Sequence, residues 1–239
     1  MKQKHRWRRL CESNPAVISA EMERSGTWLG FCVLTILVGA GFYGATIGLW
    51  RSPLQALYTG VKFPLVMLLT TAGNVLINGM LAQVLGSGVS FRQSTLAVVT
   101  SFALASLILA GLAPVMLFMW FNTPPLSVEG DALLAHNFTL LSHVLVIAFA
   151  GVMGNARLLR LLRHLSGSRA IAARVLTAWL AVNMFLGCQL SWNMRPFIGS
   201  PGLPVEFFRE DAFRGNFYES TWTALIRLGT SNSRKGATP

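Results

Sequence analysis

Five long apolar runs alternate with short polar segments along the chain. The runs cover residues 28–49, 63–85, 95–121, 132–153 and 175–192. The second and third, joined by a polar hinge over 86–92, contain no charged residue. About 20 apolar residues in a helix cross the roughly 30 Å hydrocarbon core of a bilayer. The pattern therefore predicts an all-α, polytopic integral membrane protein with five transmembrane helices.

Composition supports this prediction. Hydrophobic residues make up 53% of the 239 residues and charged residues only 12%, whereas about a quarter of a typical soluble domain is charged. The net charge of +11 would suit a nucleic-acid binder, but the basic residues lie between the apolar runs. There they set orientation and contact anionic lipid headgroups, so no nucleic-acid partner is expected.

The distribution of Lys and Arg predicts an orientation. Residues 1–26, 86–94 and 154–174 hold six, one and five of them, whereas 50–62 and 122–131 hold two and none. Cytoplasmic loops are enriched in Lys and Arg, which predicts a cytoplasmic N-terminus and a C-terminus on the other side. The C-terminal tail goes against this trend, because it holds six basic residues beside four acids.

Three regions follow from this topology: a basic cytoplasmic tail (1–27), a five-helix transmembrane domain (28–192) and an extracytoplasmic tail (193–239). The compact loops and single short N-terminal tail favour a bacterial inner membrane over a eukaryotic endomembrane. Residues 50–62 are interpreted as a connector. Pro64 is expected in the first turn of the second helix, and Pro114 is expected to kink the third.

Small residues mark one face of the first helix. Ala40, Gly44 and Gly48 recur at every fourth position, so another helix can approach closely there. Packing within the same chain is favoured over homodimerisation.

Four polar residues are predicted at mid-membrane depth: Asn74, Asn78, His143 and Asn183. Side chains at that depth should face the bundle interior and pair with one another. This polar layer has no Asp, Glu, Lys or Arg, which favours hydrogen bonds between helices. A transport path, or a porphyrin-type pigment held by His143, is the alternative.

Two charged groups lie outside the apolar runs. Arg157, Arg160 and Arg163 follow the fourth run at spacings of three, and we expect them to bind anionic headgroups; a docking surface for an acidic partner is the alternative. Arg195 follows the fifth run, and we expect it to pair with an acid such as Glu206 or Asp211 and to help form a partner contact. The spacing of Trp222, Leu225, Ile226 and Leu228 predicts a short interfacial helix.

No sequence signature of catalysis is present. Cys11, Cys32 and Cys188 are far apart, which predicts free thiols rather than a zinc site or a disulfide framework. There is no Walker A sequence, dinucleotide fingerprint, H-E-x-x-H or G-x-S-x-G. We expect neither an enzyme nor a metal- or cofactor-dependent protein.

Two stretches resemble a known family. Residues 55–64, Gln-Ala-Leu-Tyr-Thr-Gly-Val-Lys-Phe-Pro, and 112–118, Leu-Ala-Pro-Val-Met-Leu-Phe, are similar to bacterial relatives of the Yip-domain family of Ypt/Rab-interacting membrane proteins. The resemblance covers about residues 28–192 and implies five helices after a polar tail. The family's Asp-Leu-Tyr-Gly-Pro is echoed only by Leu57-Tyr58-Thr59-Gly60, so GTPase binding is not implied.

These observations favour a non-catalytic membrane scaffold or accessory subunit that packs into a larger assembly of membrane protein subunits. The alternatives are a small transporter or channel that uses the polar layer, and a pigment- or haem-binding subunit that uses His143.

Overall fold

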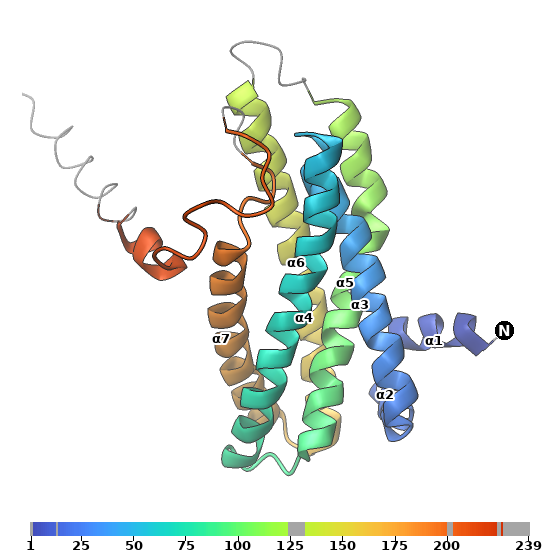
Figure 1. Ribbon diagram of the computed structural model, residues 1–239. Coiled ribbons are helices and arrows are strands. Elements are labelled where there is room, and N and C mark those ends of the chain that lie inside the picture. The colour runs from blue at the N-terminus through green and yellow to red at the C-terminus, as the bar shows by residue number, and fades with distance from the viewer. Residues whose placement is uncertain (1, 13, 124–131, 200–202, 224–225, 227–239) are drawn as a thin grey trace, which may run out of the picture.

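The computed structural model describes residues 2–12, 14–123, 132–199, 203–223 and 226, and the regular elements within these residues are helices. Figure 1 shows the elements in order. They are α1 (Lys2–Cys11), α2 (Pro15–Glu23), α3 (Ser25–Leu49), α4 (Pro53–Val84), α5 (Phe91–Phe121), α6 (Ala132–Ser166) and α7 (Arg169–Asn193).

Five helices, α3 to α7, are long and apolar enough to cross a membrane. The predicted all-α class with five candidate spans is confirmed to that extent. The chain runs alternately up and down through them, so α3 begins and α7 ends at opposite ends of the bundle (Figure 1). The N-terminal helices α1 and α2 therefore lie nearer one end, and the segment after α7 lies nearer the other.

Serine caps explain where the long helices begin. The Ser52 hydroxyl accepts from the amide of Gln55 at 3.0 Å and Pro53 follows at the first helical position, a favoured arrangement because proline lacks the N–H that would stay unpaired there. Ser90 and Gln93 form a reciprocal capping box. Because α4 begins at Pro53, residues 50–62 are not a connector, and Pro64 lies inside α4 rather than in its first turn.

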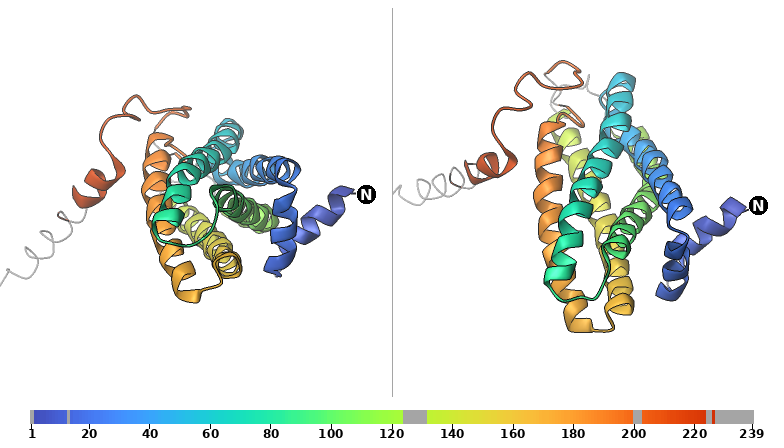
Figure 2. Two further views of the ribbon diagram at one scale, coloured as in Figure 1. Left: turned by 90° about the horizontal axis from the view of Figure 1, so that it is seen from below. Right: turned by 60° about the horizontal axis from the view of Figure 1, so that its bottom comes forward.

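The spans pack around a shared interior. Helix α3 packs against α4 and α5, α4 also packs against α5 and α7, and α6 packs against α5 and α7; Figure 2 shows this arrangement from below. Helices α3 and α4 approach each other closely. A Cβ on Gly44 would lie 2.7 Å from the carbonyl oxygen of Thr59, and one on Gly48 would overlap the backbone of Gln55. Ala40 is fully buried. The small-residue face therefore packs within the chain, against α4.

Two hydrophobic clusters fill the bundle. One contains Trp28 and Trp179 of the spans together with Leu10 of α1 and Ile18 and Met22 of α2. The other contains residues from α3, α5 and α6 and also Ile198, which follows α7. Each cluster is completed by a segment outside the five spans.

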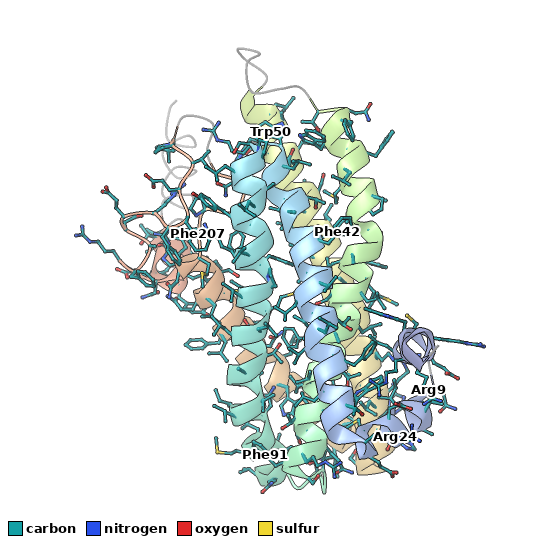
Figure 3. The ribbon with its side chains drawn as sticks, turned by 45° about the vertical axis from the view of Figure 1, so that its right-hand side comes forward. Arg9, Arg24, Phe42, Trp50, Phe91 and Phe207 are labelled. Atoms are coloured by element: carbon teal, nitrogen blue, oxygen red, sulfur yellow. The ribbon has the colours of Figure 1, made fainter. Side chains whose placement is uncertain are left out.

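Residues 1–27, predicted as a basic tail, form the two helices α1 and α2 and the start of α3. Each of these helices also has apolar residues among its polar ones, and Leu10 of α1 and Ile18 and Met22 of α2 are buried. Arg9 forms an ion pair with Glu21, and Arg92 at the start of α5 donates to the Glu23 carbonyl at 2.8 Å. The ion pair joins α1 to α2, and the Arg92 hydrogen bond joins the end of α2 to α5 at the side of the bundle (Figure 3), while α1 projects away from the bundle (Figure 2).

We predict that Gly48→Ala lowers the melting temperature of the purified protein, whereas Gly30→Ala does not. The added methyl at residue 48 would meet the Gln55 backbone, which cannot rotate away as a side chain can, while a Cβ at residue 30 meets nothing within 4 Å. Overpacking of this kind costs about 1–3 kcal/mol. Tryptophan fluorescence during heating in detergent would measure both variants, and equal melting temperatures would contradict the close α3–α4 approach.

Candidate functional site

Helix α7 ends at Asn193, and the chain then leaves the helical pattern and lies along the first turns of α4 (Figure 1). We call residues 195–211, of which 200–202 lie outside the described part, the capping loop. The face of α4 beneath it is polar. It carries Gln55, Thr59 and Lys62, and residues three or four positions apart share one side of a helix.

This polar face binds the backbone of the capping loop. The Gln55 side-chain amide donates to the carbonyls of Pro196, at 3.1 Å, and Phe197. The Thr59 hydroxyl donates to the Phe197 carbonyl at 2.9 Å, and the Lys62 ammonium to the Pro196 carbonyl at 3.0 Å. These carbonyls belong to no helix or strand, so they need donors from elsewhere when they are buried. The polar face of α4 supplies them.

Lys62 is the most unusual member of this face, because its side chain is fully buried. Its Nζ lies 4.8 Å from the centre of the Phe207 ring and 5.8 Å from that of Phe208. The two ion pairs in the described residues do not include it. A backbone carbonyl and two aromatic faces thus take the place of water around the ammonium group. The prediction that Lys62 belongs to an exposed connector is wrong.

Arg195 closes the base of the capping loop. Its Nη2 lies 3.4 Å from the Asp211 carboxylate and 3.3 Å from the Asp211 carbonyl, and its guanidinium stacks 3.6 Å from the centre of the Trp192 ring. Glu206 forms no ion pair with any described residue. Arg195 therefore pairs with one of the acids expected for it, Asp211, and not with Glu206.

A short helix over residues 217–223 follows the loop and returns to α7. The Tyr218 hydroxyl donates to the Phe185 carbonyl at 2.7 Å, and the two rings stack 5.2 Å apart. Phe213 and Trp222 stay 75% and 67% exposed. Of the predicted interfacial helix, Leu225 and Leu228 lie outside the described residues.

The structure divides the predicted polar layer. Asn74 of α4 donates to Asn183 of α7 at 2.9 Å, and Asn78 donates to Asn74 at 3.3 Å. The Trp179 indole donates to the Asn78 carbonyl at 3.0 Å. The Asn74–Asn183 and Trp179–Asn78 hydrogen bonds join α4 to α7, and the Asn78–Asn74 bond lies within α4. Nothing in their geometry favours a transport path.

His143 lies elsewhere, on α6 beside α3. Its Nδ1 lies 3.0 Å from the Tyr43 hydroxyl, and the Tyr43 ring packs on Phe63. Phe63 is three turns before Asn74 in α4, roughly 16 Å along the helix axis. His143 also lines a hollow with a cavity volume of only about 10 Å³, which is about the space that one water molecule needs. Pockets for drug-sized ligands are about 300–1,000 Å³, so the hollow does not favour a porphyrin.

The predicted arginine row lies at the other end of α6. Arg160 and Arg163 are exposed, as contact with headgroups would require. Arg157 is half-buried, and its Nη2 lies 3.5 Å from the Arg9 carbonyl. Arg157 thus contacts α1, and the other two are free to bind lipid.

Comparisons with protein-family models, with curated proteins and with solved structures gave no match to this chain. The resemblance to the Yip-domain family stays a prediction.

We predict that Gln55→Leu makes the capping loop easier to cleave with trypsin at Arg209. The substitution removes the donor shared by two loop carbonyls, and an unpaired buried polar group costs about 1–3 kcal/mol. If that cost lowers the free energy of local opening of the loop by the same amount, cleavage would be roughly five- to a hundredfold faster. Gln83→Leu, at an exposed position of the same helix, is the control. Equal cleavage rates in both variants would show that the loop does not depend on Gln55.

Proposed function

We propose that this chain is a non-catalytic membrane subunit whose capping loop and following helix dock a second membrane protein on the extracytoplasmic side. The observation that supports the proposal is that buried polar side chains fix the loop against α4. Three buried polar side chains of α4 bind its backbone, and Arg195 closes its base. The aromatic side chains of Phe213 and Trp222 are left exposed.

The way the loop is held supports a defined surface rather than a passive tail. Burying Gln55, Thr59 and Lys62 is unfavourable unless each finds a hydrogen-bond partner, and the loop backbone supplies those partners. A segment fixed in this way loses little further conformational entropy when it binds. The exposed aromatic residues Phe213 and Trp222 lie after this loop, and aromatic residues of this kind dominate protein–protein interfaces.

The shape of the apolar surface indicates the kind of partner. Exposed Phe185 of α7 stacks on Tyr218, and its neighbour Met184 is also exposed. The exposed rings of Phe213 and Trp222 belong to the same segment after α7 as Tyr218. The surface thus continues from a membrane span onto the capping loop and the helix after it. A partner that crosses the bilayer beside α7 would cover both parts, which is why we infer another integral membrane subunit.

The inferred orientation is N-terminus in the cytoplasm and loop outside, in a bacterial inner membrane by preference. At the α1–α2 end, residues 1–26, 86–94 and 154–174 carry twelve Lys and Arg, from six, one and five, against three acids. Such an excess is typical of the cytoplasmic side. Burial of Lys62 within α4 strengthens this inference, because Lys62 is then no longer one of the two basic residues counted in the extracytoplasmic segment 50–62.

We predict that Thr221→Cys reacts with a membrane-impermeant thiol reagent added to intact cells, whereas Arg163→Cys reacts only after the cells are opened. Both positions are exposed, so access to the reagent would depend on their side of the membrane. Cys188→Ala and Cys11→Ser should be present in both variants, because these native thiols are not fully buried. The reverse labelling pattern would invert the topology and place the docking surface in the cytoplasm.

We predict that a photo-crosslinking residue at Phe213 or Trp222 yields one discrete protein adduct in native membranes. The same residue at Phe149, an exposed position within the α6 span, should yield mainly lipid adducts. Mass spectrometry would identify the crosslinked species. Lipid adducts alone at Phe213 and Trp222 would mean that the aromatic side chains anchor the loop in the membrane interface, and the docking proposal would then be wrong.

A further inference from the structure

The hollow beside His143 lies between α3, α5 and α6, at the end of the bundle that Trp50 marks in Figure 3. Its walls bring together side chains of an unusual kind for a helix interior. Met116 and Met119 of α5, His143 of α6 and the indoles of Trp50 and Trp120 all line it, with threonines between them. The two methionines are three positions apart and so share one side of α5.

His143 is placed as a metal-binding imidazole would be. The residue is 4% exposed, and its Nδ1 is engaged by the Tyr43 hydroxyl at 3.0 Å. Its other ring nitrogen, Nε2, makes no hydrogen bond to any residue in the described part of the chain. When Nδ1 donates to the tyrosine oxygen, Nε2 presents a lone pair. A hydrogen bond that fixes the second ring nitrogen is the usual support for a ligating histidine.

The donor atoms select a particular class of ion. Thioether sulfur is a soft ligand that favours Cu(I), and imidazole binds copper well. Ca²⁺ and Mg²⁺ require several oxygen ligands. Among the described residues no three His, Cys, Asp or Glu side chains come close enough to share a metal ion, so zinc is also disfavoured. Indole faces attract a cation, and two of them line the hollow.

We propose that this hollow binds a single Cu(I) ion through the sulfurs of Met116 and Met119 and Nε2 of His143. The residues that line the hollow include no carboxylate. A monovalent ion suits these neutral ligands, because its single positive charge does not need a carboxylate to balance it. Tyr43 acts as the positioning residue for His143. The capping loop supplies none of the three ligands, so the proposed site does not rest on the proposed docking function.

The test uses the full chain in detergent with Cys11→Ser and Cys188→Ala, so that the two accessible thiols cannot bind the metal. Cu(I) is titrated without oxygen against a competing chelator, and Ag(I) serves as a redox-stable substitute. We expect one ion per chain. Since loss of even an indirect support costs about 10–100-fold in metal affinity, Met119→Leu should weaken binding by at least about tenfold.

Met80→Leu, at an exposed position of α4, is the matched control and should bind as the parent does. Leucine conserves the volume of methionine, so both variants should fold. X-ray absorption of the bound ion should show two sulfur neighbours and one nitrogen neighbour. Failure to bind one Cu(I), unchanged affinity in Met119→Leu, or an absorption spectrum without sulfur would each overturn the proposal.

Discussion

The close crossing of α3 and α4 is the constraint on which the rest of the structure depends. Gly44 and Gly48 let the two backbones meet at Thr59 and Gln55, where a larger residue would push them apart. The side chains of Thr59 and Gln55 bind the capping loop. On the α3 side, Tyr43 stands next to Gly44 and contacts His143. A single helix–helix contact therefore positions both the loop and the hollow, and widening it would disturb both.

At both ends of the bundle, a segment outside the five long helices covers the hydrophobic core. Five apolar helices leave polar backbone groups and charged side chains at their ends, and these must be solvated or paired. At one end α1 and α2 cover the core with Leu10 and Ile18, and charged groups such as Arg9 and Glu21 pair above it. At the other end α7 stops early, and the capping loop takes its place beside α4. A buried lysine is tolerated there because a carbonyl and aromatic rings surround it.

The five spans could be predicted because charge-free runs of that length have few other structures available. The start of α4 could not be predicted in the same way. Gln55, Thr59 and Lys62 are typical of a solvated connector unless the segment that covers them is known. Yet their spacing of four and three, after the serine cap at Ser52, was a helical signal. Three members of the predicted polar layer, Asn74, Asn78 and Asn183, are joined by hydrogen bonds as expected, and only His143 lies apart. Helix α4 begins ten residues before its apolar run, which places Asn74 further along the bundle than its position in that run indicates.

The capping loop and the hollow share one hydrophobic cluster. Ile198 of the loop belongs to the same buried group as Tyr43, Trp50 and Met116, and the last two line the hollow. Any event that lifts the loop from α4 also withdraws Ile198 from that group and loosens the wall beside Met116. If a partner holds the loop down and an ion fills the hollow, each would stabilise the arrangement that the other requires. Such coupling is reciprocal by thermodynamic necessity, so a partner that tightened ion binding would itself be bound more tightly by the ion-loaded chain.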